Sequence, residues 1–449
     1  MRDYALLVFV LGLVPLILYQ AWVGALAWTW IGLMNPHLYT WELKAFPFAQ
    51  VIGIAFLAGW ILARDRKMFP LTPGIVFLCL LYVFVTLKTP VSWNLDVAWD
   101  KWKEYTKVVV AALMIGTLIY SRRRVRWFLW VILLSIGVTY GIKGGVFAIA
   151  SGGQLHVQGP EPSFIGGNNS LGIALLMVAP LFVAFWRDTS NRWLKLGAVG
   201  GLGLTLVAII FTYSRGAWLG LVAVSFLLFL QSKRKGLVLA LVVPLAFVGA
   251  ALIPEKVYQR ADTIENYKED LSAMQRIQGW GVAVNVALQH PLGSGFVLDA
   301  TPVDVWMTYA NFHHPAFDRS NAAHSNYFQM IGDHGFGGLA LFLMVVAGTF
   351  WTLARVRLAA QRDKQLEWLG HYATALMIGL VGYCVSGAFV SLAYFDLFYT
   401  FVVLAGILAR ETEATAIPQN TDSVTPTHGA FGPRSESANA AISPTKMAS

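Results

Sequence analysis

The segment LGIALLMVAPLFVAFW, residues 171–186, decides the fold class because it runs through sixteen residues without a single charge. A helix of this length covers most of a bilayer hydrocarbon core, which is about 30 Å thick. Similar apolar blocks of about 16 to 24 residues recur along the chain. The sequence therefore predicts a membrane protein that is built from helices.

The composition supports this prediction. The chain has 449 residues, of which 57% are hydrophobic and only 13% are charged, and its mean hydropathy is +0.59. These values exclude a set of water-soluble domains. We count about twelve apolar blocks and predict an all-α polytopic membrane protein with about 12 transmembrane helices and both termini in the cytoplasm.

The first apolar block, residues 4–34, lacks a small-residue cleavage site and is followed by more apolar sequence. It is therefore expected to stay in the protein as a membrane segment. Two interpretations are open: one bent crossing with its break at Pro15, or two short crossings. The single crossing is preferred, because it leaves twelve helices with both ends of the chain on one side.

The net charge of +9 could suggest a nucleic-acid partner, but the basic residues gather in short stretches between apolar blocks. Cytoplasmic loops of membrane proteins carry such an excess of Lys and Arg. We therefore expect no nucleic-acid partner and place these stretches in the cytoplasm. They span residues 64–67, 122–126, 187–195, 233–235 and 355–364.

This topology divides the chain into four parts. Residues 1–253 form transmembrane helices 1–10, residues 254–325 form a helical periplasmic cap, and residues 326–410 form transmembrane helices 11–12. Residues 411–449 lack apolar periodicity and are expected to be a disordered cytoplasmic tail. Within the cap, near-helical apolar spacing predicts an amphipathic helix from Ser272 to Gln289.

Basic residues on the outer face are informative, because the positive-inside rule works against them there. Arg215 lies in a tight turn between two apolar helices, and Arg276 lies on the cap helix. Their guanidinium groups could hold a phosphate or pyrophosphate, or could reach lipid headgroups and solvent. Lysines of the first large outer loop could assist, or could belong to an interfacial belt with nearby tryptophans. They are Lys88, Lys101, Lys103 and Lys107, of which the first three are candidate substrate contacts.

Among the histidines, His324 is distinctive because it lies where the cap re-enters the membrane. With Ser320 or Asn321 as the N-cap, His324 falls in the first turn of a helix, where the helix dipole disfavours the imidazolium ion. A neutral imidazole could accept a proton, although a structural role is the alternative. The nearby turn Pro291–Gly295 either approaches a ligand with its backbone or simply ends the cap helix.

No pattern for a metal site is present. The chain contains no His-x-x-x-His, Cys-x-x-Cys or Asp-x-Asp sequence. We therefore expect neither a metal ion nor another cofactor, and arginines would have to stabilise a diphosphate in place of a divalent cation.

Several of these motifs together resemble the O-antigen ligase and O-antigen polymerase superfamily. The resemblance covers roughly residues 165–350. It rests on Tyr213–Gly216, Arg276, His290–Gly295, His324–Tyr327 and Gly335–Gly338. Three further stretches resemble the branch of exosortase-associated O-glycosylation ligases: Met34–His37, Phe46–Gln50 and Ser163–Asn169.

The resemblance implies a glycosyltransferase of the bacterial inner membrane with its active site on the periplasmic face. It would move an O-antigen glycan from undecaprenyl pyrophosphate to a sugar hydroxyl of lipid A-core, among membrane lipids and without a metal. Arg215 and Arg276 would bind the pyrophosphate, and His324 would take the acceptor proton. Asn169 and Arg260, with the three lysines above, are expected to contact substrate.

Three alternatives stay open. A polymerase of the same superfamily would use the same residues on a growing glycan, and a protein O-glycosylation ligase would differ only in its acceptor. A flippase or transporter of lipid-linked glycans belongs to another class. It is disfavoured by the single long outer cap and by the lack of an inverted repeat.

Overall fold

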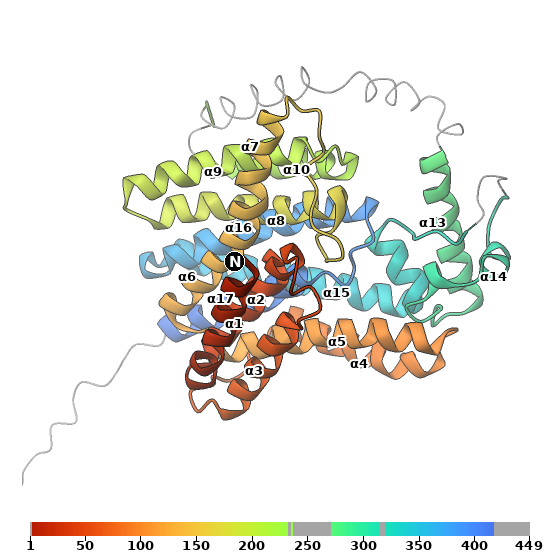
Figure 1. Cartoon of the computed structure of the whole chain (residues 1–449), viewed down its shortest axis with the longest axis horizontal. Helices are drawn as coiled ribbons and strands as arrows, with labels where there is room; N and C mark the ends of the chain where they lie inside the picture. Colours follow the sequence, from red (N-terminus) through yellow and green to blue (C-terminus); the bar gives the residue numbers. More distant parts are fainter. Residues whose placement is uncertain (1, 232–234, 237–270, 314–318, 417–449) are drawn as a thin grey trace, which may run out of the picture. The chain divides into compact units, whose positions relative to one another are not determined.

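The computed structural model describes residues 2–231, 235–236, 271–313 and 319–416 (Figure 1). Within these ranges every regular element is a helix, apart from one isolated bridge between Gly159 and Gly167. The elements are α1 (Arg2–Tyr19), α2 (Ala21–Met34), η1 (Pro36–Tyr39), α3 (Phe48–Leu62), α4 (Pro73–Lys88), η2 (Thr89–Val91), α5 (Leu95–Leu118), α6 (Ser121–Ile132), η3 (Leu133–Ile142), α7 (Lys143–Ala150), α8 (Gly167–Asp188), α9 (Arg192–Ile210), α10 (Arg215–Gln231), α13 (Leu271–Gln289), η4 (Leu298–Ala300), α14 (Val303–Met307), α15 (Asn326–Arg362), η5 (Lys364–Leu366), α16 (Glu367–Ser386), η6 (Gly387–Phe389) and α17 (Asp396–Ala416).

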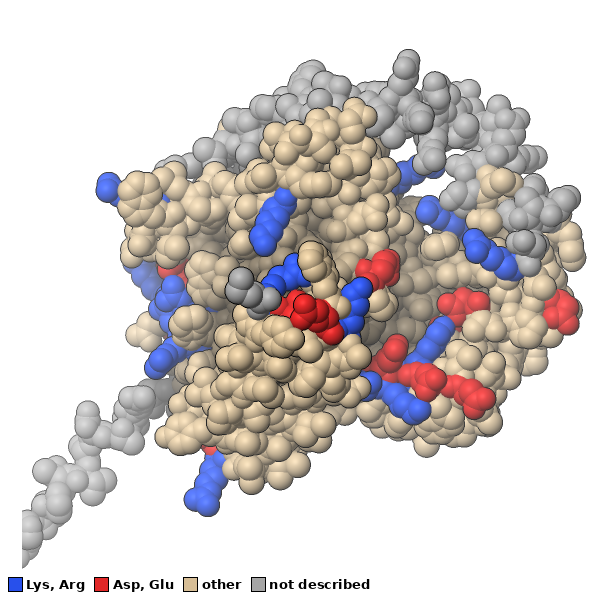
Figure 2. Space-filling model, viewed as in Figure 1, with Lys and Arg blue, Asp and Glu red and all other residues tan. Residues whose placement is uncertain are grey.

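Seven helical segments of the described chain are long and apolar enough to cross a membrane, and α2, α3 and α10 are shorter apolar helices. The surface is correspondingly poor in charge, since most of the face in Figure 2 is uncharged. The all-helical fold with membrane-spanning segments agrees with the sequence prediction. The count of about twelve crossings and the periplasmic location of the cap remain predictions.

The beginning of the chain differs from the preferred interpretation. Pro15 lies inside α1, and the helix is interrupted at Gln20 instead. The ring of Phe9 packs on Trp30 at 5.4 Å, and the carboxylate of Asp3 accepts backbone hydrogen bonds from residues 41–43. Residues 2–34 therefore form an antiparallel helical hairpin, and the prediction of one bent segment is wrong. A proline inside a helix removes one hydrogen bond and crowds the preceding turn, which bends the helix without reversing it. Packing of both α1 and α2 against α3 favours the reversal at Gln20.

Several of the basic stretches lie together at one end of α5. Arg124 pairs with Asp65 at 2.7 Å, and Arg122 pairs with Asp188 at 2.8 Å. At the opposite end of α5, Lys101 pairs with Asp299 of the cap at 2.7 Å. Since α5 has 24 residues, these two ends lie about 36 Å apart. We call them the basic end and the cap end.

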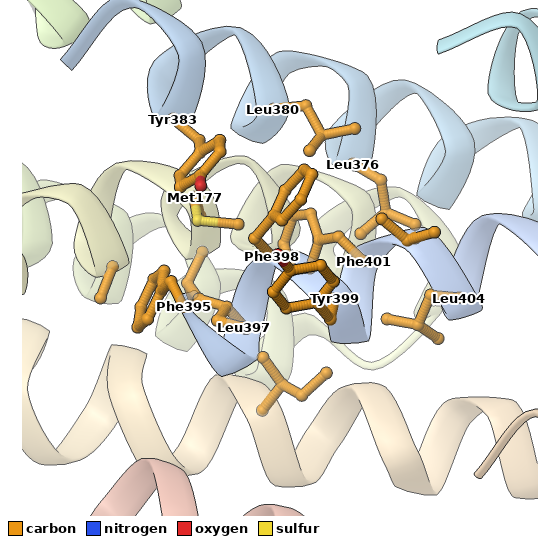
Figure 3. Close-up of a cluster of buried hydrophobic side chains, with 14 of the residues drawn as sticks. Met177, Leu376, Leu380, Tyr383, Phe395, Leu397, Phe398, Tyr399, Phe401 and Leu404 are labelled. Carbon is orange, nitrogen blue, oxygen red and sulfur yellow. The ribbon is translucent and has the colours of Figure 1, made fainter. Parts of the chain in front are cut away.

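Helix α17 forms the centre of the core. Most of its side chains are buried, and Phe398 stacks on Tyr383 of α16 with ring centroids 4.7 Å apart. Met177 of α8 joins the same cluster (Figure 3). A helix that is apolar around its whole circumference is stable only when neighbouring helices enclose it. This core holds α8, α16 and α17 as the support for the loops at the cap end.

Candidate active site

Helix α15 is interrupted at Gly335, whose φ of 65° and ψ of −170° are not helical. A side chain at this position would collide with the carbonyl oxygen of Pro291. Glycine is therefore required twice over, by its backbone conformation and by the close approach of another backbone. The interruption leaves carbonyl groups in the preceding turn that need donors from outside the helix.

The loop after the cap helix supplies most of these donors. The backbone N–H of Ser294 donates to Gly332 O at 2.9 Å, and the N–H of Gly295 donates to Asp333 O at 2.7 Å. The Pro291–Gly295 turn thus docks on the broken helix. The sequence left two interpretations of this turn open. In the structure the backbone of the turn packs against α15 and is not directed at an open ligand site.

Lys88 completes this junction. Its side chain is buried at the end of α4, and its ammonium group donates to Asp333 O at 2.7 Å. The side chain is therefore engaged with the interrupted helix. The expected contact of Lys88 with substrate has no support from this geometry, because its ammonium group is buried and already has a backbone partner.

A buried polar network lies beside the junction and was missed in the sequence analysis. Asp333 is buried, and its carboxylate accepts a hydrogen bond from the hydroxyl of Tyr394 at 2.9 Å. The same hydroxyl lies 2.9 Å from Nε2 of the buried His334. The signal was present in the sequence, since an ionisable pair inside an apolar segment is by itself a functional-site hypothesis.

The cap helix was correctly predicted. Helix α13 spans Leu271–Gln289, one residue longer at its start than the predicted element. It packs on α15 through Trp280, whose ring stacks on Phe328 at 4.9 Å and whose indole N–H donates to Ala323 O at 2.8 Å. This bond fixes the segment just before His324 to the cap helix.

His324 itself does not lie in the first turn of a helix, so that expectation is wrong. Ser325 is the N-cap of α15, and His324 precedes it with a φ of 46°. This left-handed conformation is uncommon for residues other than glycine, although histidine adopts it more often than most, and such conformations collect at functional sites. The chain turns at His324 because Ala323 is held by the hydrogen bond from Trp280, and α15 begins only after Ser325.

The protonation state of His324 nevertheless agrees with the expectation. Although one side of the residue is exposed, the surrounding protein lowers its pKa below the ordinary 6.5, and the positive charge of Arg276 lowers this pKa further. The imidazole is therefore neutral at pH 7. The cause is desolvation and a neighbouring arginine rather than the helix dipole.

Arg276 and His324 are thus brought together by α13 and the start of α15. Arg215 lies exposed at the first residue of α10. The next residue, Gly216, packs against Phe389 of η6, and Gly387 of η6 packs against Asn326 at the start of α15. The start of α10, which carries Arg215, and the start of α15, which follows His324, therefore both pack against η6.

The turn that carries Arg215 is held by Asn168 rather than Asn169. The amide of Asn168 donates to Thr212 O at 2.8 Å, and the N–H of Val157 donates to Phe211 O at 3.0 Å. Asn169 lies half-buried on α8. The Ser163–Asn169 motif thus supports the arginine turn through its other asparagine.

Three further residues were predicted to contact substrate: Lys101, Lys103 and Arg260. Lys101 forms its ion pair with Asp299, and Lys103 pairs with Asp100 at 2.9 Å. Both lysines have carboxylate partners inside the protein, although both remain at least partly exposed. Arg260 lies outside the described residues.

A small polar pocket lies next to the His324 segment. It is lined by Asp299, Asn321, Gln329, Asp333 and Ser391, together with Leu298, Ala322 and Ala323. The hydroxyl oxygen of Ser391 is buried without a hydrogen-bond partner in the described part of the chain. Carboxylate, amide and hydroxyl groups are suited to hold a hydroxyl group of a ligand. Among the residues that the structure describes, no three His, Cys, Asp or Glu side chains are grouped so as to hold a metal ion.

Two separate parts of the chain match two different protein families. Residues 200–343 match the family described as O-Antigen ligase, and this match contains the Arg215 turn, the cap helix and His324. Residues 1–159 match a family of unknown function (DUF5935). No curated protein matches the chain. The match over residues 200–343 contains Arg215, Arg276 and His324 and supports the O-antigen ligase superfamily.

Proposed function

We propose that the protein is an O-antigen ligase of the bacterial inner membrane. It transfers an O-antigen glycan from undecaprenyl pyrophosphate to a sugar hydroxyl of lipid A-core on the periplasmic face. The observation that carries the proposal is the pairing of Arg276 with a neutral His324 at the cap end, inside the O-antigen ligase match. An anion-binding group and a proton acceptor are the two functions that this transfer needs.

The arginines act on the donor. Cleavage of the bond between the anomeric carbon and the pyrophosphate oxygen leaves negative charge on that oxygen. A guanidinium fork can hold two phosphate oxygens at once and stabilises the charge as it develops. Arg276 and Arg215 approach from the cap helix and from the start of α10, so they can grip the pyrophosphate from two sides.

His324 acts on the acceptor. Its neutral imidazole takes the proton of the attacking hydroxyl as the new carbon–oxygen bond forms on the face opposite the leaving pyrophosphate. The configuration at the anomeric carbon is therefore inverted. Undecaprenyl pyrophosphate leaves with the electron pair of the broken bond, and the reaction needs neither a metal nor a cofactor.

The polar pocket is suited to the acceptor rather than the donor. Asp299 and Asp333 both line it, and carboxylates repel a pyrophosphate while they accept hydrogen bonds from sugar hydroxyls. We therefore assign the acidic groups to the acceptor and the basic groups to the donor.

The test is a transfer assay with purified full-length protein, carrier-linked glycan and lipid A-core, run in excess EDTA. We expect glycan-capped lipid A-core as the product, at the same rate with and without the chelator. Lengthening of the carrier-linked glycan without capping would assign the polymerase reaction instead. Activity that EDTA removes and magnesium or manganese restores would contradict the arginine mechanism.

A further inference from the structure

A second cavity lies far from His324 in sequence, within the part of the chain that matches the family of unknown function. It is an open groove of about 510 Å³ between α2, α3 and α5. Its walls are Trp28, Ala49, Gln50, Gly53, Ile54, Phe56, Leu57, Thr106, Lys107, Val110, Ala111 and Met114. We call it the α3–α5 groove. Its volume lies in the range of small-molecule sites.

The two long walls run in the same direction. The indole N–H of Trp60 on α3 donates to Oγ1 of Thr117 on α5 at 2.9 Å. The groove lies before this bond on both helices, with Gln50 on one wall and Lys107 on the other. The groove is therefore closed by the Trp60–Thr117 bond at one end, while polar side chains mark its other end.

The polar end carries a positive charge. Lys107 is exposed at the rim, and no ion pair of Lys107 occurs with any described residue. Lys101 and Lys103 on the same helix differ, since each pairs with a carboxylate. Lys107 lies in the middle of α5, where the charged first half of the helix gives way to the apolar second half, so the polar end of the groove is directed to the cap end of the molecule.

The rest of the groove is apolar and open to the outside. Ile54 is 71% exposed, and Leu57 and Val110 are also exposed beside it. In a membrane protein such residues contact lipid chains. From Lys107 to Met114 the groove follows α5 for about 10 Å, which is within the hydrocarbon depth of about 15 Å of one leaflet.

We propose that the α3–α5 groove binds an anionic phospholipid of the leaflet at the cap end, with one acyl chain in the groove and its phosphate at Lys107. The length of the groove along α5 matches a single acyl chain within one leaflet, and the positive charge of Lys107 at the rim complements a phosphate. An acyl chain in the groove would cover Trp28 and the backbone of Gly53. The lipid would thereby fill the space between the N-terminal hairpin and α5. This site is separate from the proposed transfer reaction.

The test measures lipid binding to the purified full-length protein by native mass spectrometry, with phosphatidylglycerol and phosphatidylcholine of equal chain length. We expect one phosphatidylglycerol to bind about fivefold more tightly than phosphatidylcholine, the preference that one lysine near a membrane surface provides. Lys107→Gln should abolish this preference. Ala111→Phe, which fills the groove, should remove the binding of both lipids.

The matched control is Lys103→Gln, which removes a charge one helical turn away that Asp100 already neutralises. It should leave the preference unchanged, and thermal unfolding should show that each variant is folded. Equal binding of both lipids by the wild type, or an unchanged preference in Lys107→Gln, would overturn the proposal. If farnesyl phosphate occupies the site and phosphatidylglycerol does not, the groove belongs to an isoprenoid lipid instead.

Discussion

The basic end and the cap end of the protein place arginine in different surroundings. At the basic end, the buried carboxylate of Asp188 holds both Arg122 and Arg126, at 2.8 and 3.1 Å. At the cap end, Arg276 lies close enough to His324 to lower its pKa, so that two basic groups share one site. An arginine that is paired with a buried carboxylate fixes helices to each other, and an arginine beside a second basic group suits an anionic substrate.

The largest effect is expected for His324→Ala. Removal of the proton acceptor should lower turnover about 10²–10⁴-fold and leave binding of the carrier-linked donor nearly unchanged. The measurement is kcat and donor affinity at equal expression. His313→Ala is the control, since His313 is an exposed histidine of the same cap. Turnover like that of the wild type in His324→Ala would remove His324 from the mechanism.

Arg276→Lys and Arg215→Lys test the cap end next. Lysine keeps the charge but loses the planar fork, so donor affinity and turnover should fall together by about 10–100-fold. Arg123→Lys at the basic end should have no effect, because Arg123 is an exposed side chain there. Full activity with lysine at position 276 or 215 would show that the corresponding arginine only faces solvent or headgroups.

Gly335→Ala tests whether the cap end depends on the break in α15. A methyl group there would collide with Pro291 O in a strained conformation, which should destabilise the protein by about 1–3 kcal/mol. Thermal unfolding and transfer activity should both decline. Gly337→Ala on the same helix meets only ordinary contacts and serves as the control. Equal stability of the two variants would show that the junction tolerates a regular helix.

The pH dependence should follow His324. Because its pKa is lowered from 6.5, the base is neutral at pH 7, and activity should be lost only as the pH falls below 6.5. In Arg276→Gln, one cause of the lowered pKa is gone, so the acid limb of kcat/KM should move to higher pH. An acid limb at the same pH in both proteins would contradict the coupling between the two side chains.

Asp188→Asn should have the smallest effect on turnover. The variant weakens the ion pairs with Arg122 and Arg126 and should cost about 1–3 kcal/mol of stability, since both arginines are half-exposed. Thermal unfolding should detect this loss while kcat at low temperature stays unchanged. A large fall in kcat at full stability would mean that the basic end takes part in transfer.

The sequence by itself determined the fold class, the cap helix and the family. Apolar blocks and the helical spacing of residues 272–289 are local patterns, because each depends only on residues within a few turns of one another. The residue types and the order of the motifs were enough to suggest the O-antigen ligase superfamily, which the match over residues 200–343 supports. The exosortase-associated branch remains a prediction.

Only the tertiary structure decided how these pieces meet. The hairpin at Gln20, the docking of Ser294 on Gly332 and the burial of Lys88 all depend on partners that are distant in sequence. His324 was assigned to a helix that begins later, because the bond of Trp280 to Ala323 O competes with the local preference for an earlier start. Local periodicity fixes where helices form, but backbone groups left without partners are satisfied only when the packed chain supplies donors.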